Sequence, residues 1–334
     1  MIVFIILVCI LILFSIKADS VILYYLVFVI LFCILGFRAL TVGTDIDNYI
    51  NIFYYYDGFI EIGWQAISGL VRYINGDFRT LMYFAAILTL LPLFYFVKKT
   101  SFLPIISLLF YVLLGSYFFA FNIMRQSIAI SFFALAWYFF SENKKWKWVI
   151  SCIIGLTFHY TMIILIPFFF LFKYFQRMKS STRIILLIAS LIIGPFLDVF
   201  IRQLITLIGG DYAAYSEYGS EYDINLLNSF MMQLIKSIFF IICYIRYVNK
   251  NNLYLVLFYI GLILSNLLSY TIGINRIGYY FMIFSIVFFA NYIAEADSTS
   301  SKALNTATIL IYGITLFAYL MLKQSEGTIP YNFM

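Results

Sequence analysis

The sequence predicts an all-α, polytopic integral membrane protein, a helix bundle of about 11–12 membrane segments. Composition is the first observation: 64% of the residues are apolar and 11% are charged, whereas soluble domains contain about 45–50% apolar and about 25% charged residues. The second observation is that long apolar runs fill most of the chain, because about 17–25 residues suffice to cross a bilayer as a helix. The third is that these runs lack the alternation of β-barrel strands.

The apolar runs follow one another with short polar connections and two long loops. The first run ends before Lys17 and lacks both a basic leader and a cleavage site, which favours a first span over a removed signal peptide. Nothing in the sequence indicates a second, soluble domain, so we expect residues 1–334 to form a single multi-span membrane domain. In order, the runs cover residues 1–16, 21–37, 80–97, 102–119, 126–140, 148–172, 184–200, 228–248, 253–270, 277–293 and 303–322.

The run at 148–172 has basic residues on both sides. The positive-inside rule places both flanks in the cytoplasm, which one straight crossing cannot achieve. We therefore expect a helical hairpin or a broken, re-entrant pair whose apex lies near Thr157–Thr161 and includes His159. Irregular backbone at membrane depth is tolerated only where it is buried in protein or lines a wet cavity. The flanking residues are Lys144, Lys145, Lys147, Lys173, Arg177, Lys179 and Arg183.

With this hairpin, lysines collect on the cytoplasmic side and arginines on the outer side. Loops 38–79 and 201–227 are then external, and loops 98–101, 141–147 and 173–183 are cytoplasmic. A guanidinium suits bidentate recognition of phosphate or carboxylate better than an ammonium does. The outer arginines therefore point to an anionic substrate.

Metal, redox and nucleic-acid chemistry are not expected. Cys9, Cys33, Cys152 and Cys243 lie in apolar runs without CxxC spacing, so we predict neither a disulfide nor a metal site. A single histidine is no zinc site, and no nucleotide-binding motif is present, so we expect no cofactor. The net charge of +6 is a topology signal in a membrane protein and does not indicate nucleic acid.

The first candidate site is VGTDIDNY at residues 42–49, where the large outer loop begins. Its carboxylates, Asp45 and Asp47, suit sugar hydroxyls, a divalent cation or the role of a base, and Tyr49 suits contact with sugars. The alternative is a helix start, with Thr44 or Asp45 as the cap and Asp47 in the first turn.

The second candidate is EIGWQAISGLVRYI at residues 61–74. Glu61, Gln65, Ser68 and Arg72 share one face, which predicts an amphipathic helix on the outer leaflet. The functional interpretation makes Glu61 and Trp64 sugar-facing groups, and the alternative is a lid over the spans.

The third candidate is FNIMRQSIA at residues 121–129, where Asn122, Arg125 and Gln126 share a helix face. An arginine that enters an apolar helix is costly without a partner, and a diphosphate suits its guanidinium. The alternative is an anchor at the membrane interface. The fourth candidate is His159, which as a neutral base suits a sugar hydroxyl, although a lone histidine is more often structural.

Two further candidates lie later in the chain. Arg276, within GINRIGYYF at residues 273–281, is either a site residue or part of an interfacial aromatic belt. The Tyr-rich loop at 212–222 suits contact with sugars. Lys236 lies within a predicted span, where it either pairs with an acid, reaches the interface or serves function.

The order of the segments GTDIDNY, EIGW, FRTLMYFAA, MRQSIAIS and FHYTMIILIP resembles the EpsG/Wzy-type polysaccharide polymerases of bacterial capsule, exopolysaccharide and O-antigen clusters. The match covers Gly43 to Pro167, and the later NRIGYYF is compatible with it. The resemblance implies a multi-pass glycosyltransferase at the outer face of the bacterial cytoplasmic (inner) membrane. This enzyme takes a glycan from a polyprenyl diphosphate carrier and transfers it to a lipid-linked repeat unit.

The resemblance implies catalytic roles for Arg125 and His159, with Asp45 in the neighbouring loop. We expect Arg125 and Arg276 to stabilise the departing diphosphate, and His159, or else Asp45, to act as the base. The implied partners are the polyprenyl-diphosphate-linked oligosaccharide, membrane lipid, and a chain-length regulator and flippase of the same pathway. The residues expected to bind substrate are Arg276, Asp47, Asn122, Gln126, Trp64, Glu61 and Tyr49.

Other classes of membrane protein remain as alternatives. A lipid-linked oligosaccharide flippase or other polytopic transporter would also carry intramembrane charge, but such proteins often show internal repeats, and this sequence has no such symmetry. A membrane acyltransferase would place its histidine on a cytoplasmic or midplane path. An assembly protein without activity is a further alternative.

Overall fold

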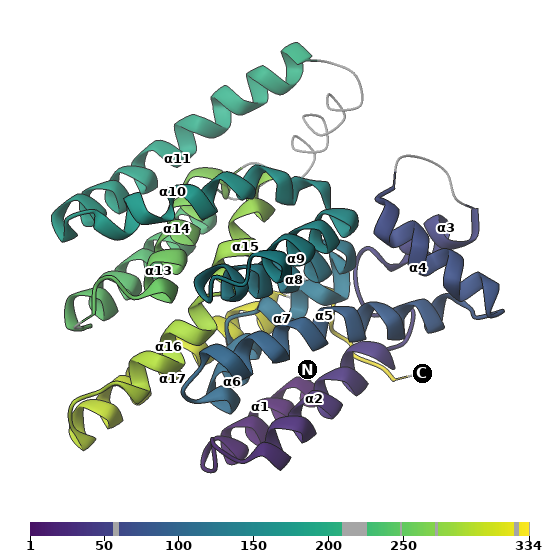
Figure 1. Ribbon diagram of the computed structural model, residues 1–334, viewed down its shortest axis with the longest axis horizontal. Helices are drawn as coiled ribbons and strands as arrows, with labels where there is room; N and C mark the ends of the chain where they lie inside the picture. Colours follow the sequence, from purple (N-terminus) through teal and green to yellow (C-terminus); the bar gives the residue numbers. More distant parts are fainter. Residues whose placement is uncertain (56–59, 209–225, 248, 271–272, 324–326, 334) are drawn as a thin grey trace. The chain divides into compact units, whose positions relative to one another are not determined.

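The computed structural model describes residues 1–334 except 56–59, 209–225, 248, 271–272, 324–326 and 334 (Figure 1). The described residues form α-helices and short 3-10 helices, with one isolated β-bridge between Arg38 and Phe333 and no strand. The predicted all-α class is therefore confirmed. Every predicted apolar run coincides with one or more helices.

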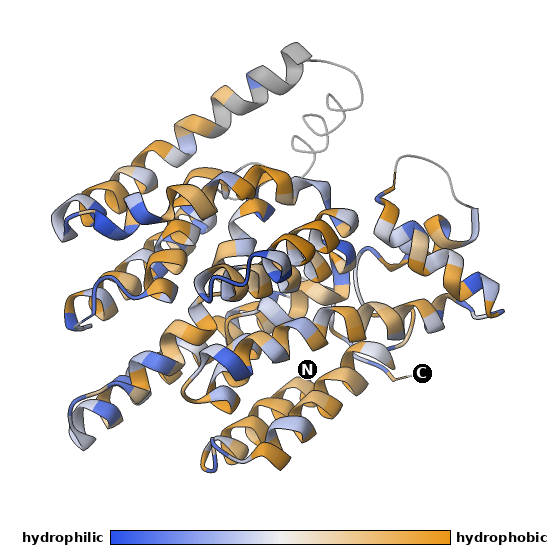
Figure 2. Ribbon diagram, in the orientation of Figure 1, coloured by the Kyte–Doolittle hydropathy of each residue, from blue (hydrophilic) through white to orange (hydrophobic). Residues whose placement is uncertain are grey.

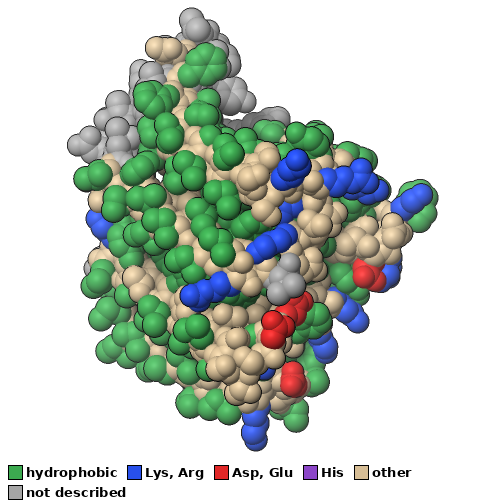
Figure 3. Space-filling view, turned by 90° about the vertical axis from the view of Figure 1, so that its left-hand side faces the viewer, with side chains coloured by type: hydrophobic (Ala, Val, Ile, Leu, Met, Phe, Trp, Pro, Cys, Tyr) green, Lys and Arg blue, Asp and Glu red, His purple; other side chains and the backbone are tan. Residues whose placement is uncertain are grey.

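Several helices are long and apolar enough to cross a membrane. Among the described residues, five pass by length and composition, or six if the bent pair Pro104–Leu113 and Ser116–Asn122 forms one span. Figure 2 shows hydrophobic residues along most of the described helices, and Figure 3 shows hydrophobic side chains widely exposed on one face. Surfaces of this kind are unfavourable in water, so the chain is a multi-pass membrane protein. The five helices are Phe78–Thr100, Ser180–Leu197, Leu227–Arg246, Ile274–Ala294 and Thr299–Lys323.

The helices fall into two compact units, Met1–Phe169 with Ile286–Met334, and Phe170–Ser285. The single domain over residues 1–334 stays a prediction. The first unit contains α1 (Ile2–Ser15), α2 (Val21–Gly36), α3 (Ile46–Tyr55), α4 (Ile62–Tyr73), α5 (Phe78–Thr100), α6 (Pro104–Leu113), α7 (Ser116–Asn122), α8 (Met124–Ser141), α9 (Lys145–Phe158), the 3-10 helix η1 (Tyr160–Leu165) and α17 (Thr299–Lys323). The second contains α11 (Ser180–Ile208), α13 (Leu226–Arg246), α14 (Leu253–Leu268), the 3-10 helix η2 (Ile274–Gly278) and α15 (Tyr279–Met282). Helices α10 (Ile166–Arg177) and α16 (Ser285–Ala294) include the residues where the units divide.

The core of the first unit lies around α8, which packs between α5 and α9. Trp137 of α8 is fully buried, and its ring stacks on Phe169 with centroids 4.3 Å apart. Large aromatic rings bury much apolar area and prefer such defined geometries. The packing of α8 against α9 holds the first turn of α8, which carries Arg125, near the end of α9, which precedes His159.

Two helix breaks interrupt predicted runs of the first unit. The break at His159 was predicted: α9 ends at Phe158, His159 is extended (φ −157°, ψ 108°), and η1 follows. The break at Gly115 was not, since residues 102–119 are one apolar run. Gly115 has φ +87°, a left-handed conformation that glycine adopts most readily, and α6 and α7 meet at 57°. Both breaks interrupt apolar helices of this unit.

The amphipathic helix α4 packs differently from the prediction. It contacts α5 and α9, with Trp64, Ser68 and Val71 buried. Leu70, predicted on the face opposite Glu61, is 48% exposed. The buried side of α4 therefore includes Ser68 from the predicted polar face. This orientation of α4 follows from the close approach of Gly63, in its first turn, to Thr157 of α9.

The second unit is organised by buried polar side chains. The Asn266 side chain on α14 donates through Nδ2 to Ser190 Oγ on α11 (2.9 Å) and to Ser237 Oγ on α13 (3.1 Å). All three residues are buried. Hydrogen bonds of this kind between helices stabilise membrane bundles, because an unpaired polar group in an apolar interior is costly.

Candidate functional site

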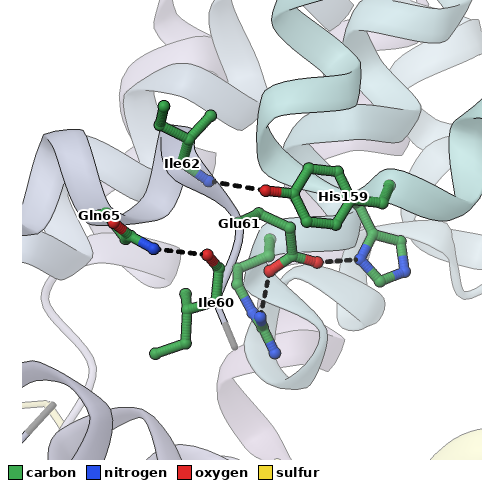
Figure 4. A network of polar contacts seen from close by, with 7 residues as sticks. Ile60, Glu61, Ile62, Gln65 and His159 are labelled. Carbon is green, nitrogen blue, oxygen red and sulfur yellow. Dashed lines mark hydrogen bonds and ion pairs between the residues drawn. The ribbon is translucent and has the colours of Figure 1, made fainter. Parts of the chain in front are cut away.

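The candidate site of the first unit is built on the carboxylate of Glu61, the residue before α4. Its Oε1 lies 2.9 Å from Nδ1 of His159, and its Oε2 accepts from Nη1 of Arg125 (Figure 4). Arg125 lies in the first turn of α8, and His159 lies at the break after α9. Three segments that are distant in sequence therefore meet at one side chain.

Burial differs within this network. The Glu61 side chain is 8% exposed, whereas those of Arg125 and His159 are 23% and 24% exposed. Burial raises the pKa of the Glu61 carboxyl, but the hydrogen bond with His159 and the charge of Arg125 lower it by more, so the pKa lies below its ordinary value. The carboxylate is thus ionised at neutral pH, and it holds two groups that each keep an accessible edge.

Aromatic residues line the other side of Arg125. The guanidinium carbon lies 5.7 Å from the centroid of the Tyr49 ring on α3, and cation–π contacts of this kind favour a bound cation. The Tyr49 ring in turn lies 5.2 Å from the Trp64 ring. Tyr49 and Trp64 are 5% and 1% exposed, respectively. Their predicted contact with sugars stays a prediction, and in this structure they support the arginine from within the fold.

The chain around Glu61 is pressed closely against the segment that carries His159. A Cβ on Gly63 would lie 2.7 Å from the carbonyl oxygen of Thr157, so any larger residue there would force the backbone to move. The backbone N–H of Ile62 donates to the hydroxyl of Tyr160 over 3.4 Å. These contacts lie just after Glu61 in one segment and on either side of His159 in the other, so the two side chains meet over a short, fixed distance.

The acids predicted for the site, Asp45 and Asp47, lie at the start of α3. The carbonyl of Asp45 accepts from the N–H of Tyr49 (3.1 Å), and Asp47 lies in the first turn of the helix. The interpretation as a helix start therefore fits the structure. Thr44 Oγ1 donates to the Asp45 carboxylate over 3.0 Å. The catalytic role of Asp45 and the binding role of Asp47 stay predictions.

Asn122 and Gln126 are buried, at 4% and 3% exposure. The Oδ1 atom of Asn122 accepts from the N–H of Thr44 over 2.7 Å. Gly43, at φ +118°, lies so close that a Cβ would be 2.8 Å from the carbonyl oxygen of Phe121. Asn122 thus positions the loop before α3 beside α7 and α8, and the binding of substrate by Asn122 and Gln126 stays a prediction.

Two predicted parts of the site stay predictions. Arg276 is exposed and belongs to η2 of the second unit, so its contact with the diphosphate stays a prediction. The Tyr-rich loop at 212–222 lies outside the described residues, and its contact with sugars stays a prediction. Within the described part of the chain, no group of three or more His, Cys, Asp or Glu side chains is arranged to hold a metal ion.

Sequence reasoning placed Arg125 and His159 in one site and Glu61 among the sugar-binding residues, but it missed Glu61 as the partner that the other two share. Arg125 is 64 residues from Glu61, and His159 is 98 residues from it. No local spacing reports such contacts. The available signal was charge balance: a costly arginine and a single histidine in apolar surroundings need an acidic partner, and Glu61 immediately precedes the amphipathic helix α4.

Fold and site together define a multi-pass helical membrane protein with a carboxylate-linked arginine and histidine where apolar helices begin and end. The model of the EpsG family matches residues 21–333, nearly the whole chain, so the protein belongs to the EpsG family. This is a family of Wzy-type polysaccharide polymerases, which makes the chain a polysaccharide polymerase-type membrane protein. The match extends well beyond the segment from Gly43 to Pro167 that carries the resemblance in sequence. No significant match was found among curated proteins or among solved structures.

Proposed function

We propose that the protein transfers a glycan from a polyprenyl diphosphate carrier onto a lipid-linked repeat unit, at the outer face of the bacterial cytoplasmic membrane. The observation that carries this proposal is the contact of Arg125 and His159 with one buried carboxylate, while each keeps an exposed edge. A cation for a leaving diphosphate and a base for an attacking hydroxyl are the two groups that glycosyl transfer from such a donor requires.

The proposed reaction replaces one bond at the anomeric carbon of the donor glycan. The bond from this carbon to the diphosphate oxygen breaks, and its electron pair leaves with the diphosphate, where the guanidinium of Arg125 offers charge-assisted hydrogen bonds. The acceptor hydroxyl oxygen forms the new bond, and its proton passes to His159. Asp45 is the second candidate for the base, and Arg276 for a second cation at the diphosphate.

Purified protein in liposomes provides the test. Polyprenyl-diphosphate-linked repeat units are added, and polymer length is read on a gel. We expect polymer from the natural protein and from Lys145→Ala, a control at an exposed lysine, and little from His159→Ala. A flippase would move the lipid-linked unit across the bilayer without lengthening the glycan, so movement without polymer would overturn the proposal. A chain-length regulator and a flippase of the same pathway are the partners to add next.

A further inference from the structure

We infer that Glu61 is a positioning residue, whose carboxylate fixes the tautomer of His159 and the separation of His159 from Arg125. This inference rests on the proposed function and deepens it. The sequence suggested instead that Glu61 faces a sugar. In the structure both carboxylate oxygens are engaged, Oε1 by His159 and Oε2 by Arg125, and the side chain is 8% exposed.

The contact with Nδ1 determines where the imidazole proton lies. An ionised carboxylate only accepts hydrogen bonds, so Nδ1 of His159 must carry the proton that joins it to Oε1. In the neutral ring the lone pair is then on Nε2. Within the described residues no hydrogen bond to Nε2 is found, and the side chain is 24% exposed. Nε2 is thus the atom left to take a proton from a hydroxyl.

The same carboxylate also sets the distance between His159 and Arg125. A guanidinium has five N–H donors, and Glu61 engages Nη1 of Arg125, which leaves donors for a diphosphate. His159 and Arg125 bind the two different oxygens of one planar carboxylate, so the carboxylate sets the distance between the base and the cation. The acceptor hydroxyl and the leaving diphosphate oxygen must both reach one anomeric carbon, so a fixed separation of the two groups favours the reacting geometry.

The backbone around Glu61 supports this role. The approach of Gly63 to the Thr157 carbonyl and the hydrogen bond from Ile62 to Tyr160 join the two segments just beside the network. A side chain that only bound sugar would need no such bracing against the segment of the base. A positioning group does, because its effect depends on orientation.

The chain contains one histidine, so its tautomer can be read directly. Protein labelled with 15N-histidine is placed in lipid nanodiscs at pH 8 without substrate, and the imidazole nitrogen shifts are recorded. We expect a protonated Nδ1 and an unprotonated Nε2 in the natural protein and in Glu142→Gln, which makes the same change at an exposed acid. In Glu61→Gln we expect the preference to be lost, with protonated Nε2 becoming detectable.

Kinetics provide a second readout. Glu61→Gln should lower kcat by about 100-fold, the lower end of what a positioned base contributes, with KM for the lipid-linked acceptor changed by less than about threefold. A sugar-binding role would instead raise KM. Gly63→Ala, which displaces Glu61 without altering its chemistry, should shift the tautomer and kcat in the same direction and covers the case in which Glu61→Gln does not fold.

A natural protein with its proton on Nε2, or identical spectra in both Glu61→Gln and Gly63→Ala, would overturn the positioning role. Because the spectra are recorded without substrate, that result would leave the transferase proposal standing. Conversely, the expected tautomer in a protein that makes no polymer would refute the proposed function alone.

Discussion

Arg125 in the first unit and Arg183 in the second are both arginines in the opening residues of apolar helices, yet they have different surroundings. Arg183 is 1% exposed and donates to the carbonyls of Phe175 (3.1 Å), Gln176 (2.8 Å) and Lys250. Arg125 is 23% exposed and donates to the Glu61 carboxylate, with the Tyr49 ring also against its guanidinium. The guanidinium of Arg183 is enclosed by the fold, whereas that of Arg125 has an edge available.

The partners explain the difference. The last carbonyls of a helix have no partner within it, and Phe175 and Gln176 lie in the last turn of α10, so Arg183 satisfies groups that the fold leaves open. Arg38 does the same in the first unit, donating to Leu35 (2.6 Å) and Phe121 (3.1 Å) near the ends of α2 and α7. An arginine bound to carbonyls is structural, and an arginine bound to a carboxylate beside a histidine is the better candidate for chemistry.

The largest expected effect is on Arg183. Arg183→Ala removes a buried charge and its hydrogen bonds to several partly buried carbonyls at once, and it should destabilise the protein by about 3–5 kcal/mol, the scale of a broken buried charge interaction. Membrane abundance and thermal unfolding in detergent measure this loss. Arg125→Lys, which keeps a cation beside the Glu61 carboxylate, is the control, and it should change unfolding far less. Equal destabilisation by the two variants would remove the distinction between a structural and a functional arginine.

Arg125→Lys is the corresponding test of function. Charge is kept, but two parallel donors become a point charge, and the loss of one donor to a developing anion costs about 2–4 kcal/mol. The rate of polymer formation should therefore fall on the order of 30- to 1,000-fold, at unchanged membrane abundance. Polymer length on a gel measures this. Full-length polymer at the normal rate would make Arg125 an interfacial anchor.

Low pH should also distinguish the Glu61 network from the surroundings of Arg183. The folded pKa of Glu61 is below its ordinary value of 4.5, so the stability that its ionised form contributes is present above that pH and is lost as pH falls through the folded pKa. The difference in unfolding temperature between the natural protein and Glu61→Gln should therefore shrink from pH 7 toward pH 3.

The carbonyl partners of Arg183 do not titrate, so the deficit of Arg183→Ala should stay constant over the same range. A Glu61→Gln deficit that is equally constant would mean that the Glu61 network does not depend on the charge of its carboxylate. Both variants are measured against the natural protein in one buffer series, so loss of stability elsewhere in the chain at low pH affects them alike.

The sequence predicted the fold better than the site for a physical reason. Membrane spans are local, so composition and run length place each helix without knowledge of its neighbours. The break at His159 followed from basic residues on both flanks. The break at Gly115 was missed because LLGSYFF reads as continuous apolar helix, and only the left-handed Gly115 reveals it.

The site depends on contacts between distant segments. Arg183 was interpreted only as a topology signal, since nothing near it in sequence shows that it would meet carbonyls 67 residues away at Lys250. Trp64 and Tyr49 were expected to face sugars, and their burial follows from how α3 and α4 pack, which side-chain type alone does not determine. The residues were therefore identifiable, but not their partners.

The smallest expected effect concerns the ring beneath Arg125. Tyr49→Phe keeps the aromatic face 5.7 Å from the guanidinium carbon. It removes only the hydroxyl and its hydrogen bond with Arg125, and such a bond is worth about 0.5–1.5 kcal/mol net. The rate of polymer formation should fall about 2- to 10-fold, well short of Arg125→Lys. Tyr244→Phe beside Arg183 is the matched change in the second unit, since Tyr244 also presents its ring to a guanidinium, at 6.0 Å, and it should leave the rate unchanged. If Tyr49→Phe were as damaging as Arg125→Lys, the phenol itself would take part in the reaction, and the chemistry would extend from the shared carboxylate onto α3.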